Sequence, residues 1–134
     1  MKIAICPGSY DPVTYGHLDI IKRSAVLVDK LIVTVFVNPS KKTSLFSIEE
    51  RLDMLRETTK DIPNVEVDTS TGLLNVYAAS KNCHLLIRGL RAFSDFEYEF
   101  QRALMIKKID PTLETAFFMT DGRYSYLSST GVRE

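Results

Sequence analysis

Residues 7–17 place a glycine- and proline-rich turn and a histidine between an apolar stretch and a helical pattern. A helix N-terminus presents unpaired N–H groups and a partial positive charge, and both attract phosphate. Gly8 and Gly16 let a ligand approach the backbone closely, because glycine has no Cβ atom. His17 can add a hydrogen bond or a positive charge at the same place. The stretch therefore predicts a phosphate site, and the alternative is an ordinary turn with a surface histidine.

Chemically distinctive residues also follow the other predicted strands. These segments are residues 38–42, 71–74, 88–91 and 123–130. Because these segments, like residues 9–17, each follow a strand of a parallel sheet, we expect all of them at the edge formed by the carboxyl ends of the strands. Ligands of open parallel sheets bind beyond that edge. His17, Lys41, Arg88 and Arg91 then form a concentrated anion site.

Each of these cations also has a simpler explanation when it is taken alone. Lys41 lies beside Lys42, and adjacent lysines are typical of a solvated loop. The two arginines could instead pair with acidic residues of the helix that follows them. Those residues are Asp95, Glu97 and Glu99. The shared edge of the sheet favours the anion site, because surface ion pairs have no preference for that edge.

The elements that position these residues alternate between strands and helices. Strands are predicted at residues 2–6, 30–37, 84–87 and 114–120, and a further strand is predicted to begin with residues 65–67. Helices are predicted at 17–28, from a capping box at Ser47 and Glu50, at 73–81, from Ser94 or Asp95 to about Ile109, and after Ser128 or Ser129. This order predicts an α/β fold, a five-stranded parallel, doubly wound (Rossmann-like) sheet with helices on both faces. In the fourth helix we expect Phe96, Tyr98 and Phe100 to lie mostly in the core.

The composition is that of an ordinary globular chain. With 134 residues, of which 45% are hydrophobic, the sequence predicts a single domain over residues 1–134. The 17 basic and 17 acidic residues cancel, which disfavours a nonspecific nucleic-acid binder because such proteins carry a basic excess. Cys6 and Cys83 lack metal-ligand spacing and are typical of buried thiols in a reducing compartment. The longest apolar run, residues 31–37, is too short to cross a membrane, and no secretory leader is recognisable, so we expect a cytoplasmic protein.

Several common site motifs are missing from the sequence. It contains neither the G-x-x-x-x-G-K-[ST] motif of P-loop enzymes nor a G-x-G-x-x-G motif after the first strand. It also lacks zinc-ligand spacing and a G-x-S-x-G nucleophile elbow. A basic edge also disfavours a signalling receiver domain, which needs an acidic cluster at its strand ends. These absences favour a phosphate site of a different kind.

The motifs resemble those of a known enzyme family. Thr14-Tyr15-Gly16-His17, preceded by Pro7-Gly8-Ser9-Tyr10-Asp11-Pro12, is similar to the Thr-x-Gly-His motif of the nucleotidyltransferase superfamily. Arg88-Gly89-Leu90-Arg91, followed by Asp95-Phe96-Glu97-Tyr98-Glu99, is more specific and resembles the bacterial phosphopantetheine adenylyltransferases. Residues 39–42, 46–51 and 124–129 continue the likeness, which covers essentially the whole chain.

The resemblance implies that an adenylyl group is transferred from ATP to 4′-phosphopantetheine, giving dephospho-coenzyme A and pyrophosphate. It implies that phosphopantetheine is held by Ser9, Lys41, Leu73, Leu74 and Arg88. It implies that ATP is held by Ser9, Tyr10, His17, Gly89, Leu90, Arg91, Glu99, Tyr124, Ser125, Tyr126, Leu127, Ser128, Ser129 and Thr130. The catalytic groups it implies are His17, Lys41 and Arg91.

The implied chemistry fits these residue types. A phosphate monoester has a second pKa of about 6, so the acceptor is already anionic at neutral pH and needs no general base. In-line transfer then requires alignment and charge neutralisation, which cations and helix ends supply. We expect Mg²⁺ to arrive with the phosphates of ATP.

Two features qualify the likeness, and two other functions stay open. Chains of this family normally continue with further helix, so we expect the C-terminal helix to be truncated here and the lid over the active site to be affected. The family forms hexamers, which implies a homo-oligomer. Tyr15 stands where relatives often have Asn, at a position outside the groups named above. The alternatives are a non-catalytic nucleotide-binding module and another nucleotidyltransferase with Thr-x-Gly-His.

Overall fold

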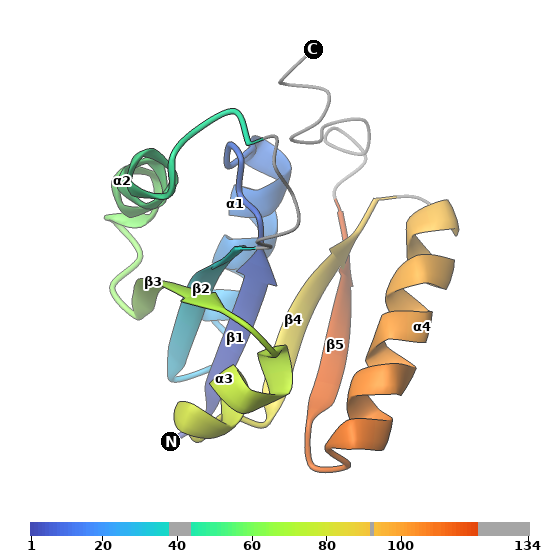
Figure 1. Cartoon of the computed structure of the whole chain (residues 1–134). Coiled ribbons are helices and arrows are strands. Elements are labelled where there is room, and N and C mark those ends of the chain that lie inside the picture. The colour runs from blue at the N-terminus through green and yellow to red at the C-terminus, as the bar shows by residue number, and fades with distance from the viewer. Residues whose placement is uncertain (38–43, 92, 121–134) are drawn as a thin grey trace.

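Strands and helices alternate along the chain in the order that the sequence predicts (Figure 1). The computed structural model describes residues 1–37, 44–91 and 93–120, with side chains described from residue 96 onward in the last range. The elements are β1 (Ile3–Gly8), α1 (Tyr15–Ala25), β2 (Lys30–Val37), α2 (Ile48–Thr59), β3 (Val65–Thr71), α3 (Leu74–Ser80), β4 (Leu85–Leu90), α4 (Phe93–Ile109) and β5 (Glu114–Met119). The helix expected after Ser128 or Ser129 lies outside the described residues.

Several boundaries differ from the prediction in the same direction. Strands β1 and β4 run further toward their carboxyl ends than predicted, to Gly8 and Leu90, and β3 includes Thr71, which was predicted to lie in a turn. These end residues were predicted to follow the strands, but the pairing of the sheet continues through them. Helix α1 begins two residues before His17 and ends at Ala25 rather than Val28.

The five strands are all parallel, in the order β3-β2-β1-β4-β5, which confirms the predicted fold class. The chain steps outward from β1 through β2 to β3 and then crosses back to place β4 on the other side of β1 (Figure 1). The direction of winding therefore changes between β1 and β4. In open α/β sheets, ligands bind in the crevice at this switch point.

Helices cover both faces of the sheet, and each face has its own apolar core. Alternate residues of β2 point to opposite sides: Val33 belongs to the core beneath α1 and α2, and Ile32 to the core beneath α3 and α4. Ile21 and Leu55 fill the first core, and Tyr77 is part of the second. Burial on both faces explains why β2 is an almost continuous apolar run.

The predicted capping box opens α2. The Glu50 N–H donates to Ser47 Oγ at 3.1 Å, and the Ser47 N–H donates to Glu50 Oε1 at 3.0 Å. The bond from the Ser47 N–H to the carboxylate favours its charged form and is the largest cause of the lowered pKa of Glu50. The capping box fixes where α2 begins. The buried Arg51, near the start of α2, contacts the site described below.

The prediction that Phe96, Tyr98 and Phe100 lie in the core is wrong, because all three are exposed, by 41%, 65% and 43%. Helix α4 packs against β4 and β5 at one side of the sheet, so much of its surface is left uncovered among the described residues (Figure 1). Ile106 packs on that side, whereas Phe96 and Phe100 stack on each other with ring centroids 5.5 Å apart.

Both cysteines are buried and free, as the sequence predicts. Among the described residues, no helix combines the length and the apolar content that a membrane crossing requires. The cytoplasmic location stays a prediction.

Candidate active site at the carboxyl ends of β1 and β4

His17 is fixed by the residue that caps its helix. Thr14 is the N-cap of α1, and its Oγ1 accepts the His17 N–H at 3.2 Å. In return the Thr14 N–H donates to His17 Nδ1 at 3.0 Å, which completes a capping box with histidine in the place usually taken by Glu or Gln. Because Nδ1 accepts a hydrogen bond, the proton of the neutral ring is on Nε2. His17 is thus oriented as an Nε2–H donor.

The surroundings of His17 keep it uncharged at neutral pH. Burial, followed by the charges of Arg91 and Arg88, lowers the pKa of His17 to about 4. Of the two roles considered from the sequence, the structure therefore favours the hydrogen bond over the positive charge. The ring of Tyr10 supports the imidazole edge-on, with centroids 4.9 Å apart.

Tyr10 itself is turned into the protein. Its hydroxyl donates to the Cys6 carbonyl at 2.9 Å, and its side chain is 3% exposed. A Cβ atom at Gly8 would lie 3.1 Å from Tyr10 Cε2, so glycine at this position lets the Tyr10 ring pack closely on β1. Any contact of Tyr10 with ATP must then come from its backbone. Burial raises the pKa of both Tyr10 and Cys6, which disfavours either as a nucleophile.

Arg88 is the central cation at the end of β4. Its Nε and Nη2 donate to the two carboxylate oxygens of Glu99 at 2.9 and 2.7 Å, and its Nη1 donates to the Pro7 carbonyl at 2.7 Å. The ion pair that the sequence left open is therefore formed with Glu99. Burial alone lowers the pKa of Arg88, but the bonds and charge of Glu99 outweigh burial and raise it. The Pro7 contact links β4 to β1 across the switch point.

A pocket opens beside this ion pair, between α3, α4 and the sheet. It is lined by Leu74, Leu86, Arg88, Glu99, Arg102, Ala103, Ile106 and Thr115. Leu74, a predicted substrate contact, is part of the wall, whereas its neighbour Leu73 is 66% exposed and is not among the lining residues. The pocket combines an apolar wall with guanidinium groups. Its lining therefore offers apolar contacts next to cationic groups that can bind an anion.

Gly89, Leu90 and Arg91 lie where β4 ends and α4 is about to begin. A Cβ atom at Gly89 would lie 3.2 Å from Ile20 Cγ1, so glycine here permits α1 to pack closely on β4. Arg91 is exposed, and its charge reaches His17, since it contributes to the lowered pKa of that residue. The structure thus brings the predicted residues of β1, α1 and β4 to one edge of the sheet.

Asp11 and Arg51 hold the first turn in place, and the sequence did not single out either for this role. The buried Asp11 carboxylate accepts the N–H groups of Leu45 and Phe46, each at 2.8 Å. Arg51 donates to the Ser9 carbonyl at 3.2 Å from the first turn of α2. The resemblance includes both residues, but their contacts join segments that are far apart in the chain, which no local pattern shows. Lys41 and residues 124–130 lie outside the described residues.

Comparisons with known proteins identify the family. Residues 5–134 match the family model described as cytidylyltransferase-like. The phosphopantetheine adenylyltransferase of Caldanaerobacter subterraneus is 61% identical over the whole of this chain and 83% of its own length. The enzyme of the same name from Clostridium tetani is 54% identical over the same share of each chain.

Solved structures of lower identity share the fold. A pantoate-beta-alanine ligase from Francisella tularensis has a TM-score of 0.70 at 15% identity, covering 99% of this chain and 65% of its own. The nicotinic acid mononucleotide adenylyltransferase of Plasmodium falciparum has a TM-score of 0.68 at 15% identity, covering 98% and 82%. These structures show the shared fold. The sequence matches show that the chain belongs to the cytidylyltransferase-like family and, within it, to the phosphopantetheine adenylyltransferases.

Proposed function

We propose that the chain transfers the adenylyl group of ATP to 4′-phosphopantetheine, giving dephospho-coenzyme A and pyrophosphate in coenzyme A biosynthesis. The observation that carries the proposal is that a neutral histidine donor after β1 and the Arg88 guanidinium on β4 lie at the same edge of the sheet, beside a partly apolar pocket. They are close enough for the Arg88 charge to contribute to the lowered pKa of His17. The choice of acceptor is supported by identities of 61% and 57%, over the whole of this chain, to relatives named phosphopantetheine adenylyltransferase.

In the proposed reaction, a phosphate oxygen of phosphopantetheine attacks the α-phosphorus of ATP. The bond from that phosphorus to the bridging oxygen breaks, and the electron pair leaves with pyrophosphate. The attacking oxygen is already anionic, so no side chain has to remove a proton. The His17 Nε2–H donates to the charge that develops on the transferred group, an interaction that strengthens in the transition state. Lys41 and Arg91 are proposed to neutralise charge in the same step.

Arg88 can bind the acceptor phosphate while it keeps its present partners. A guanidinium has five N–H donors, and the bonds to Glu99 and Pro7 use three of them. The remaining donors, one on each terminal nitrogen, are available for a phosphate. Leu74 and the apolar wall of the pocket would then accept the pantetheine arm. Ser9 and the exposed Leu73 are proposed as further contacts.

Mg²⁺ is proposed to bind through ATP rather than through a protein cage. Among the residues that the structure describes, no group of three or more His, Cys, Asp or Glu side chains could hold a metal ion. Asp11 and Glu99, two carboxylates near this edge, both accept N–H groups. The donor set therefore fits a magnesium ion that is liganded by the ATP phosphates and water. Bound there, it would neutralise phosphate charge.

Release of pyrophosphate tests the proposal. We expect release only when ATP, Mg²⁺ and 4′-phosphopantetheine are all present, and none when any one of them is omitted. Replacing ATP with CTP, or the acceptor with nicotinamide mononucleotide, should abolish release. ATP binding without release would favour the non-catalytic module, and release with nicotinamide mononucleotide would favour a different nucleotidyltransferase.

We also propose that the chain forms a homo-oligomer, with a hexamer implied by the resemblance. Helix α4 carries several large apolar side chains that are exposed by 41–66%, and exposed apolar patches of this kind mark interaction surfaces. They are Phe96, Tyr98, Phe100, Leu104, Met105 and Ile109. Sedimentation equilibrium should give six times the chain mass, and a monomer at micromolar concentration would contradict the assembly.

A further inference from the structure

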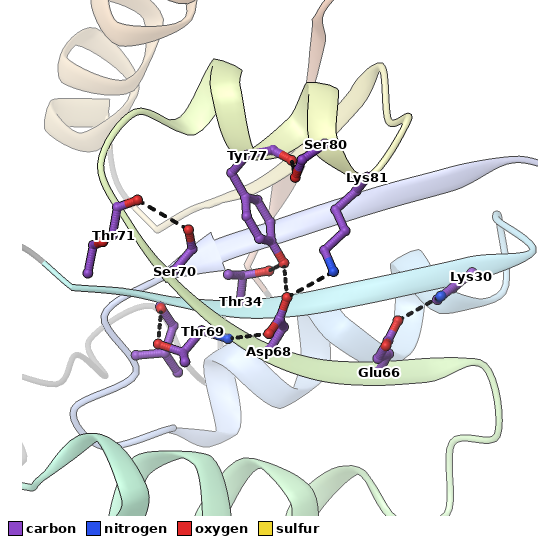
Figure 2. Close-up of polar contacts among 11 residues, drawn as sticks. Lys30, Thr34, Glu66, Asp68, Thr69, Ser70, Thr71, Tyr77, Ser80 and Lys81 are labelled. Carbon is purple, nitrogen blue, oxygen red and sulfur yellow. Dashed lines mark hydrogen bonds and ion pairs between the residues drawn. The ribbon is translucent and has the colours of Figure 1, made fainter.

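A partly buried polar network ties α3 to the sheet (Figure 2). The Tyr77 hydroxyl on α3 donates to Asp68 Oδ2 on β3 at 2.6 Å, and Thr34 Oγ1 on β2 lies 3.0 Å from the same hydroxyl oxygen. A phenol has one O–H, so Thr34 is the donor in the second contact. Thr34 is fully buried and pairs directly with Asp68 in the register of β2 and β3. The side chains therefore form a chain of donors that ends at the carboxylate.

The carboxylate at the end of this network is kept charged. The Thr69 N–H donates to Asp68 Oδ1 at 2.8 Å, and Lys81 Nζ lies 3.3 Å from Oδ2. Burial raises the pKa of Asp68, but the bonds from Tyr77, Thr69 and Lys81 outweigh it and lower the pKa overall. The bond from Tyr77 is therefore charge-assisted, which makes it stronger than one between neutral groups.

Helix α3 depends on this anchor because little else fixes it. It has seven residues, and its N-cap, Leu73, makes no side-chain capping bond. Helices this short are unstable in water unless tertiary contacts hold them. Only Tyr77 and Ala78 of α3 are buried. The Tyr77 ring packs edge-on against Phe36 with centroids 5.3 Å apart, and its hydroxyl supplies the bonds to β2 and β3.

The same helix supplies one wall of the pocket beside Arg88. Leu74 lines that pocket and lies three residues before Tyr77, so both side chains project from the same side of α3. The preceding turn at Gly72 has a φ of +87°, a conformation that side chains disfavour. Because Leu74 and Tyr77 lie on the same side of α3, the place where Tyr77 holds the helix also sets the position of Leu74.

We propose that Tyr77 is a positioning residue for phosphopantetheine: its hydroxyl, held by Asp68 and Thr34, fixes α3 so that Leu74 keeps the apolar wall of the pocket in place. This inference rests on the proposed function and assigns a role to a side chain that is absent from the pocket lining. The inference concerns phosphopantetheine rather than ATP, because the wall that α3 supplies belongs to the pocket beside Arg88.

Tyr77→Phe tests the inference, because it removes the hydroxyl and keeps the ring against Phe36. The matched control is Thr59→Val, which removes a buried hydroxyl that donates to the Leu55 carbonyl at 2.7 Å on α2, across the sheet. In Tyr77→Phe we expect amide hydrogen exchange in residues 74–80 to accelerate about tenfold, with the rest of the chain unchanged. Calorimetry should show a Kd for 4′-phosphopantetheine about fivefold to tenfold higher, an unchanged Kd for ATP and a KM effect without loss of kcat. Thr59→Val should leave the exchange in α3 and both Kd values unchanged.

Unchanged exchange in residues 74–80 of Tyr77→Phe would overturn the anchoring role. Faster exchange with an unchanged Kd for phosphopantetheine would overturn the link from Tyr77 to the pocket. An equal rise in the Kd for ATP, or the same rise in Thr59→Val, would assign the effect to general loss of stability and also overturn it. If the unmodified chain binds no phosphopantetheine, the proposed function itself fails, and this inference fails with it.

Discussion

His17→Ala should lower kcat by about 10²–10³-fold while the Kd values for ATP and 4′-phosphopantetheine stay within a few-fold of the unmodified chain. The imidazole is pre-oriented by the Thr14 N–H on Nδ1, so its Nε2–H meets developing charge without reorganisation. Such a donor acts mainly in the transition state, and its removal costs turnover rather than binding. Single-turnover kinetics and calorimetry on both substrates measure the two effects separately.

His84→Ala is the matched control, because His84 is the second of the two histidines in the sequence and is exposed at the opposite end of β4. It should leave kcat unchanged. An equal loss of binding and turnover in His17→Ala would contradict a role in the transition state. A loss of kcat between pH 6 and pH 8 that follows the titration of His17 would also contradict this role. A pKa of about 4 keeps the imidazole neutral over that whole range.

The lowered pKa of His17 also makes the free energy of unfolding depend on pH. The folded state holds this imidazole neutral down to about pH 4, whereas the unfolded chain protonates it near 6.5. The unfolded state therefore binds more protons between these values, so the His17 contribution to folding free energy decreases as the pH falls through that window. His17→Ala should lack this part of the pH dependence in urea unfolding curves.

Glu99→Ala should lower the free energy of unfolding by about 3 kcal/mol and the melting temperature by roughly 10 °C. The pair is largely buried, with 22% of the Arg88 side chain and 14% of the Glu99 side chain exposed. Truncation removes two charge-assisted bonds and leaves the guanidinium beside the pocket without its carboxylate. Thermal and urea unfolding followed by circular dichroism measure the loss.

Two further measurements connect this effect to the site. Glu97→Ala, on the exposed side of α4, is the control and should change the melting temperature by little. Inorganic phosphate should raise the melting temperature of Glu99→Ala more than that of the unmodified chain, because an anion can replace the lost carboxylate at Arg88. Equal stabilities of Glu99→Ala and Glu97→Ala would contradict the importance of the ion pair.

The fold class followed from local patterns that the structure confirms. The almost continuous apolar run of residues 30–37 indicated a strand covered on both faces, and β2 has a core on each side. Ser47 and Glu50 showed their capping box through spacing alone. Thr14 and His17 have the same spacing, but the pattern is usually defined with Glu or Gln, and so the start of α1 was placed two residues too late.

Features that depend on distant contacts were beyond the sequence. Periodicity shows that α4 is a helix but not how much of its surface the sheet covers, so the prediction for its aromatic residues was wrong. Arg88 had several acidic candidates within one helix, and only packing selects Glu99. The contact of Tyr77 with Thr34 joins residues 43 positions apart, and it depends on the register of β2 and β3.

The most direct test of the central claim is to identify the products that the chain forms from ATP, Mg²⁺ and 4′-phosphopantetheine, by mass spectrometry and phosphorus NMR. The account predicts dephospho-coenzyme A and pyrophosphate in equal amounts, with no turnover of ATP when phosphopantetheine is left out. AMP with pyrophosphate in place of dephospho-coenzyme A, or ATP consumption that does not depend on the acceptor, would contradict it.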